Sequence, residues 1–187
     1  MQPVSAAADA PYGNILVVAL FDSFDARRYL EKEIVKELAE RGVEATAMTA
    51  STDTRTIINR DTVIDRITRS GADAVLVTQL VSFEAQGKAK DANPEATYIF
   101  RPTYWYNVFE VDLEEYVEPQ YVQWTNELAL SSDLFSAASR EKVWAMQSDW
   151  KFKKKLEPGM DYSVIVDEAK AIVRAAERNK LLDGQGS

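Results

Sequence analysis

Two acidic residues follow the first apolar run of the sequence, and they are its clearest candidates for ligand binding. Asp22 and Asp25 come directly after the run at 15–21. Open α/β sheets bind ligands beyond the carboxyl ends of their strands, and two carboxylates there could hold Mg²⁺ or anchor a small molecule. Alternatively, they only cap the helix that follows. Because neither a glycine-rich phosphate loop nor a third acidic residue at a strand end accompanies them, capping is favoured.

The sequence contains neither histidine nor cysteine. Imidazole bases, thiol nucleophiles and soft metal ligands are therefore absent, and catalysis would have to use carboxylate, Lys, Tyr or Ser groups. Ser139 and Lys142 have the S-x-x-K spacing of serine acyl enzymes, in which the lysine activates the serine. That motif should begin a helix, whereas these residues fall in a predicted turn with no K-T-G motif downstream. We therefore expect no enzymatic activity and no cofactor.

Charged residues cluster locally, and their overall balance is acidic. Thirty acidic and 22 basic residues give a net charge of −8, which argues against nucleic acid as a partner. An acidic cluster between 110 and 118 lacks the spacing and the turn glycine of an EF-hand and is interpreted as a solvated face. The basic run at 151–155 could contact anionic lipid headgroups, but a polar strand end is the simpler interpretation.

Aromatic residues are concentrated in and just after the segment 87–120. Nine of the 19 aromatic residues lie between Tyr98 and Trp124. Such residues are enriched at protein interfaces, but long loops also carry packed clusters of their own, so an interface and a satellite core both remain open. Because a structureless loop of this length is unusual, part of it should form an added hairpin or a partner-binding flap. The candidate partner-binding residues are Tyr98, Phe100, Tyr104, Trp105, Tyr106 and Phe109.

The first half of the sequence predicts alternating strands and helices that would position the two aspartates. Its first apolar run is rich in β-branched residues, as is typical of a strand buried on both faces. A strand-helix-strand-helix-strand order favours parallel pairing through right-handed crossovers. The predicted elements are strands at 15–21, 43–48 and 72–83, a helix that begins after Ser23 or Asp25 and ends before Gly42, and a helix at 61–70.

The second half predicts an antiparallel hairpin followed by a closing helix. The expected fold class is therefore mixed α/β, a two-layer or three-layer sandwich, and 187 residues fit one domain. The predicted strands cover 121–132 and 142–153, and Asp161 is expected to cap a helix that extends to Leu181 and Leu182. The domain covers 14–183, and a flexible leader and a disordered tail are expected at 1–13 and 184–187.

The hairpin and the closing helix resemble those of small bacterial envelope lipoproteins of unknown function. The resemblance is carried by Leu128, Leu130, the DLF at 133–135, the EKVWA at 141–145 and the AIVRAAERNKLL at 171–182. It extends over roughly residues 14–183 and concerns structural motifs rather than chemistry. It implies a domain similar to the N-terminal domain of TolB and to the periplasmic domain of the curli secretion lipoprotein.

The same resemblance implies a location and a role. The domain would lie at the periplasmic face of the outer membrane, held only by a lipidated cysteine upstream of the tether at 1–13. We therefore expect a non-catalytic envelope lipoprotein that binds envelope proteins or copies of itself. The alternative is a small-molecule or metal-binding, or hydrolytic, α/β domain that uses Asp22 and Asp25.

Overall fold

The computed structural model describes residues 10–51, 58–90, 97–100, 121–155 and 161–184. The chain divides into two compact units. The single domain expected over 14–183 stays a prediction. The first unit comprises Met1–Gln79, Ser131–Gln147 and Ile165–Ser187, and the second comprises Leu80–Leu130 and Ser148–Val164.

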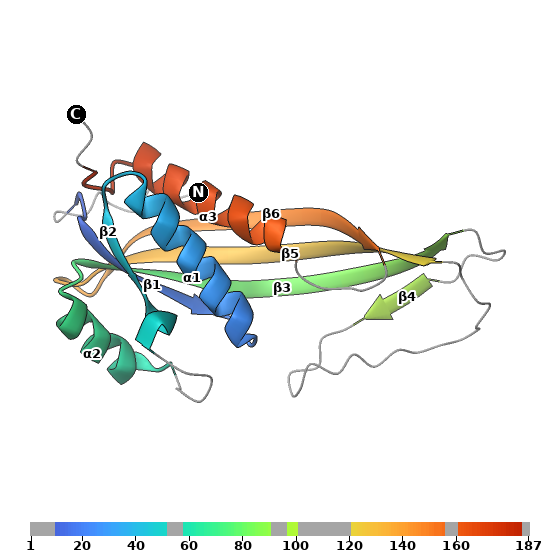
Figure 1. Cartoon of the computed structure of the whole chain (residues 1–187), viewed down its shortest axis with the longest axis horizontal. Helices are drawn as coiled ribbons and strands as arrows, with labels where there is room; N and C mark the ends of the chain where they lie inside the picture. The colour runs from blue at the N-terminus through green and yellow to red at the C-terminus, as the bar shows by residue number, and fades with distance from the viewer. Residues whose placement is uncertain (1–9, 52–57, 91–96, 101–120, 156–160, 185–187) are drawn as a thin grey trace. The chain divides into compact units, whose positions relative to one another are not determined.

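The fold is mixed α/β, as predicted from the alternation of elements. Its six-stranded sheet has the order β2-β1-β3-β5-β6, with β4 paired to β3 (Figure 1). β1 is parallel to both β2 and β3, and β4 is antiparallel to β3. The strands are β1 (Asn14–Leu20), β2 (Glu44–Ala47), β3 (Ala74–Lys90), β4 (Thr97–Phe100), β5 (Tyr121–Ser136) and β6 (Lys142–Lys155).

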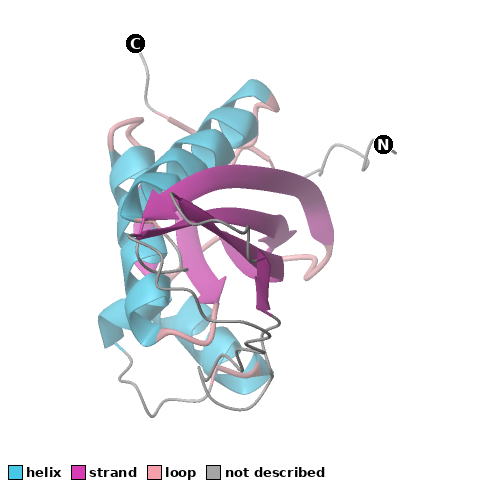
Figure 2. Cartoon of the chain, turned by 90° about the vertical axis from the view of Figure 1, so that its right-hand side faces the viewer, coloured by secondary structure: helices cyan, strands magenta, loops and turns pink. Residues whose placement is uncertain are grey.

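β1 is buried on both faces, which explains its continuous apolar sequence. Its five residues from Ile15 to Ala19 are at most 1% exposed. On one face, Val63 and Ile67 of α2 (Arg60–Ser70) pack against the core cluster that contains Leu16 and Val18. The crossover β1-α1-β2 leads to one side of β1, and the crossover β2-α2-β3 leads back past β1 to its other side. Because both crossovers are expected to be right-handed, α1 and α2 lie on opposite faces of the sheet. The first unit therefore has helices on both faces of its strands. In Figure 2 the helices (cyan) lie to the left of and below the strands (magenta).

The helices begin and end at residues suited to those positions. The Ser23 hydroxyl caps α1 (Phe24–Ala39) by accepting a hydrogen bond from the Ala26 N–H at 3.3 Å, which confirms one of the two expected caps. Asn59 and Thr62 form a capping box on α2 (Arg60–Ser70), which ends at Gly71 with a left-handed φ of 66°. None of the three α-helices in the described residues has the length and apolar character needed to cross a bilayer.

The closing helix α3 (Tyr162–Arg178) ends earlier than its apolar pattern predicts. Asp161 accepts a hydrogen bond from the Ser163 N–H at 2.9 Å and so caps its start, as expected. After the helix, Lys180 adopts a left-handed φ of 56° that turns the chain away from the helix axis. Leu181 and Leu182, predicted to be helical, therefore lie beyond the helix end.

Tyr12 is part of the packed structure, although the sequence pattern places it in the leader. It is 1% exposed, its N–H donates to the Leu181 carbonyl, and its carbonyl accepts from the Asp183 N–H, each at 2.8 Å. The packed chain therefore begins before Asn14, while residues 1–9 and 185–187 lie outside the described residues. A lone tyrosine among Ala, Pro and Gly gives no periodic signal.

The β5-β6 hairpin is confirmed, with strands longer than predicted. Alternate residues of β5 remain buried past residue 132, notably Leu134 at 2% exposure and Ser136 at 1%. The Arg140 N–H donates to the Ser136 carbonyl and closes the turn, in which Arg140 has a positive φ of 60°. Polar residues at 132–136 suggest a turn by composition, but their alternation with Leu134 keeps them in the strand.

Candidate functional site

The position beyond the carboxyl end of β1 holds both predicted ligand residues. Asp22 and Asp25 are exposed at the start of α1, and Asp25 lies in its first turn, where a negative charge interacts favourably with the helix dipole. Within the part of the chain that the structure describes, no three His, Cys, Asp or Glu side chains gather as a metal site would require. A ligand role for the two aspartates stays a prediction.

A third carboxylate, Glu31, lies near the same strand end and is fully buried. Its Oε1 accepts a hydrogen bond from the Ala19 N–H at 2.9 Å. Its Oε2 accepts from both the N–H and the hydroxyl of Thr49, at 2.7 Å and 2.6 Å. One side chain of α1 thus binds the end of β1 and the 3₁₀ turn Met48–Ser51 that follows β2. The carboxylate satisfies backbone groups that burial would otherwise leave unpaired.

The environment of Glu31 has opposing effects on its pKa. Burial raises the pKa of the Glu31 carboxyl above its ordinary value of 4.5, because desolvation disfavours the charged form. The hydrogen bonds from Thr49 and Ala19 and the charge of Arg27 act in the opposite direction, but the net shift is upward. All three donor groups belong to Ala19 and Thr49, which are themselves buried in the fold. The carboxylate is therefore a structural group rather than a ligand-binding one.

Sequence reasoning missed Glu31 although a signal for it exists. Leu30, Ile34 and Leu38 form the buried stripe of α1. Glu31 is three residues before Ile34 and seven before Leu38, so the helical repeat places it on that same stripe. A charged residue on a buried helical stripe requires hydrogen-bond or ionic partners. The position of Glu31 on this stripe therefore predicts a buried carboxylate that is bound by other parts of the fold.

The raised pKa predicts a pH-dependent stability difference for Glu31→Gln. The folded protein binds a proton at Glu31 at higher pH than the unfolded chain, so this contribution to stability is fully present below the unfolded pKa of 4.5 and is lost as pH rises through the folded pKa. Because glutamine does not titrate, subtracting the unfolding free energies of the two proteins isolates the effect. We expect glutamine to cost more at about pH 4 than at about pH 7. Denaturant titrations with a cost that is constant or grows toward neutral pH would contradict this expectation.

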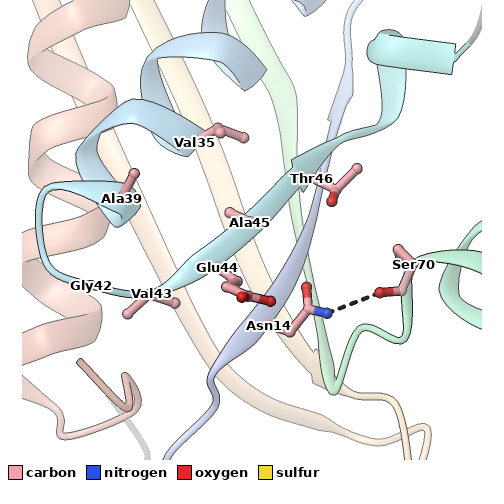
Figure 3. Close-up of a pocket in the computed structure, with 9 residues that line it drawn as sticks. All are labelled: Asn14, Val35, Ala39, Gly42, Val43, Glu44, Ala45, Thr46 and Ser70. Carbon is pink, nitrogen blue, oxygen red and sulfur yellow. Dashed lines mark hydrogen bonds between the residues drawn. The ribbon is translucent and has the colours of Figure 1, made fainter. Parts of the chain in front are cut away.

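The pocket in Figure 3 lies at the opposite end of β1. It has a volume of about 470 Å³, and within it the Asn14 side-chain amide donates to the Ser70 carbonyl at 2.9 Å. Glu44 is the only ionisable residue among those that line it, so the pocket has no acid-base pair. It can offer hydrogen bonds to a ligand but no nucleophile activated by a base. Its lining residues are Asn14, Val35, Ala39, Gly42, Val43, Glu44, Ala45, Thr46 and Ser70.

Ser139 and Lys142 have separate contacts of structural type. Ser139 lies in the β5-β6 turn, where its N–H donates to the Ser136 hydroxyl and its hydroxyl accepts from the Glu141 N–H. The Lys142 ammonium lies 3.6 Å from Asp133 in an ion pair across the hairpin. The S-x-x-K spacing is thus located in the turn, as expected, and not at the start of a helix.

The expected added hairpin is present, since β4 pairs antiparallel with the distal part of β3. Tyr98 is opposite Gly87, and Phe100 is opposite Ala85. For Tyr98 and Phe100 the structure describes only the backbone. The other candidate partner-binding residues, Tyr104, Trp105, Tyr106 and Phe109, lie outside the described residues. The interface prediction for all six therefore stays a prediction.

Trp124 belongs to a small core of the second unit. It is 6% exposed and packs with Ala85, while Phe83 and Val122 pack against this pair. The indole ring lies directly over Gly87, because a Cβ built on that glycine would lie 2.7 Å from a ring carbon of Trp124. For this aromatic residue, the satellite-core interpretation is the correct one.

No protein-family model matches the chain, and no curated protein matches it. Several solved structures are similar. A PelC dodecamer from Paraburkholderia phytofirmans is 10% identical with a TM-score of 0.44, over 94% of this chain and 93% of that one. Lipoprotein GNA1162 from Neisseria meningitidis is 11% identical with a TM-score of 0.44, over 88% and 96%.

A minor lipoprotein from Acinetobacter baumannii is also similar, at 10% identity and a TM-score of 0.41, over 91% of this chain and 97% of that one. Bacterial lipoproteins are therefore among the structural neighbours of the chain. The resemblance to TolB and to the curli secretion lipoprotein stays a prediction from the sequence.

Proposed function

We propose that the chain is a non-catalytic envelope lipoprotein domain that binds other envelope proteins or copies of itself, with the free edge of β6 as a binding surface. The observation that carries this proposal is the position of β6. It is a 14-residue strand at the end of the sheet order, and no described strand pairs with its outer side. An open edge presents unpaired N–H and C=O groups to which a further strand can add.

The side chains of β6 alternate in exposure along the strand. From Trp144 to Lys155 its residues alternate between half-buried and exposed, so one face of the strand points to solvent along its length. Exposed residues 145 and 147 are uncharged, whereas lysines occupy 151, 153 and 155. Lysine on an edge strand discourages indiscriminate pairing. The uncharged part of the edge lacks that protection.

The chemistry of the described residues supports a binding role over a catalytic one. The buried carboxylate Glu31 accepts hydrogen bonds from three donors of the fold, and the pocket beside β2 has one ionisable residue. The envelope location and the lipid anchor rest on the sequence resemblance. The six aromatic residues between Tyr98 and Phe109 provide a further proposed contact surface, because Tyr, Trp and Phe are enriched at interfaces.

A lysine pair on the uncharged part of the edge tests the proposal. The variant Ala145→Lys with Gln147→Lys adds two positive charges at exposed positions, so the fold should tolerate it. We expect self-association or retention of envelope proteins to weaken by at least about threefold. Size-exclusion chromatography with light scattering and pull-down from envelope extracts measure these quantities.

Glu40→Lys is the matched control for this test. It changes the net charge by the same amount at an exposed position at the end of α1. It should leave binding unchanged. A wild-type chain that is strictly monomeric and retains no envelope protein would contradict the proposed function, and equal binding by both variants would place the binding surface elsewhere than β6.

A further inference from the structure

The free edge of β6 carries a charge pattern that fits a second copy of the same edge. We propose that two copies of the chain pair their β6 strands antiparallel, with Trp150 at the two-fold axis and Asp149 of each copy opposite Lys151 of the other. This inference rests on the proposed function, because it names a second copy as a partner of the sheet edge. The residues of the central pairs, 148–152, all belong to the second unit.

The charges next to the axis are arranged for such pairing. Asp149 and Lys151 are both on the exposed face of β6. Lys151 contacts Glu127 of β5 in an exposed ion pair, whereas Asp149 has no ion pair within the described part of the chain. Directly opposite residues on neighbouring strands have Cβ atoms about 4.5–5.5 Å apart. A second β6 would therefore place Lys151 between Glu127 of its own copy and Asp149 of the other, in a row of alternating charges.

Charge also distinguishes this register from its neighbours. An axis at Asp149 would place the two Asp149 side chains opposite each other, and an axis at Lys151 would do the same with two lysines. An axis between residues would set the exposed face of one strand against the half-buried face of the other. With the axis at Trp150, Lys153 and Lys155 are opposite uncharged residues, and the two Trp150 rings form an aromatic cross-strand pair.

The symmetry of this pairing limits its size. Each copy uses the same edge, so the contact is isologous and closes as a dimer rather than continuing as a filament. The alternative interpretation is that the lysines only guard the edge against pairing. Under that interpretation the chain is monomeric through β6, and reversing the charge at position 149 has no effect on association.

Two charge reversals and their mixture test the proposal. Asp149→Lys alone places lysine opposite lysine, and Lys151→Asp alone places aspartate opposite aspartate. Each variant should self-associate about tenfold or more weakly than wild type, because two attractive pairs per dimer become repulsive. Mixed in equal amounts, one copy of each restores both opposite-charge pairs. We expect a heterodimer with a dissociation constant within about threefold of wild type.

The measurements are sedimentation equilibrium for the single proteins and native mass spectrometry for the mixture. Circular dichroism melting checks that each variant is folded, which matters for Lys151→Asp because it removes the contact with Glu127. Higher salt should weaken wild-type association and strengthen that of each single variant. A mixture that forms no heterodimer, or variants that associate as wild type does, would overturn the proposal.

These outcomes are separable from those of the proposed function. A wild-type monomer that still retains envelope proteins would overturn the β6 dimer and leave the binding role in place. A dimer that responds to the charge reversals as expected, but retains no other protein, would support self-assembly as the binding role.

Discussion

Replacing Glu31 with alanine should lower the free energy of unfolding by about 3 kcal/mol. The change removes the acceptor for the N–H groups of Ala19 and Thr49 and for the Thr49 hydroxyl. Glu31 and Thr49 are buried, so solvent is not at hand to replace the lost acceptor. A buried donor without a partner costs about 1–3 kcal/mol, which makes three orphaned donors a severe loss even after partial rearrangement.

Denaturant unfolding followed by circular dichroism measures this effect, with Glu33→Ala as the matched control. Glu33 is on the same helix, and its side chain, 16% exposed, contacts Lys36, whose side chain is 58% exposed, in an ion pair at 3.7 Å. Ion pairs that reach solvent contribute between about 0 and 1 kcal/mol. Equal stability of the two variants would show that the Glu31 hydrogen bonds do not hold β1, α1 and the following turn together.

Replacing Gly87 with valine should destabilise the second unit by about 2 kcal/mol. The Trp124 ring occupies the space that a side chain on residue 87 would need, and even the first added carbon would lie 2.7 Å from it. Trp124 is 6% exposed, so its ring can leave only by disturbing Ala85, Phe83 and Val122. Overpacking of this type costs about 1–3 kcal/mol.

Hydrogen exchange of β3 and β5 amides, combined with denaturant unfolding, locates and measures the loss. Gln86→Val is the control, because residue 86 is exposed and its side chain points to the other face of β3. It should change stability by less than about 0.5 kcal/mol. Adding Trp124→Leu to Gly87→Val should recover part of the loss by making room. Failure to recover any would contradict the packing explanation.

The sequence predicts those parts of the fold in which side-chain periodicity and burial coincide. The apolar run at 15–21, the helix expected to end before Gly42 and the helix expected at 61–70 each indicate one local structure, and each prediction is confirmed by β1, α1 and α2. Boundaries fail where tertiary contacts outweigh composition. Ser132 and Ser136 suggest a turn, yet they remain in β5 because Leu134 between them is buried.

The candidate site was only partly accessible from the sequence. Asp22 and Asp25 could be placed at a strand end because the order of elements defines that position. The partners of Glu31 could not, since the Thr49 groups that bind it are 18 residues away and converge on it only after β2 has paired with β1. Similarly, nothing in the order of residues indicates that the Trp124 ring would lie over Gly87.

The contact of Tyr12 with the chain after α3 has a mechanical consequence. Its two hydrogen bonds join segments about 170 residues apart, so closing that loop is among the most entropically costly steps of folding. We therefore expect the two Tyr12 hydrogen bonds to form late in folding and to break early in unfolding. A pulling force applied ahead of residue 12 would reach these two bonds before β1, and they would yield while the central strand keeps its parallel neighbours on both sides. Under such a force we therefore expect the Tyr12 contacts to be lost before the pairing of β1 with its neighbours.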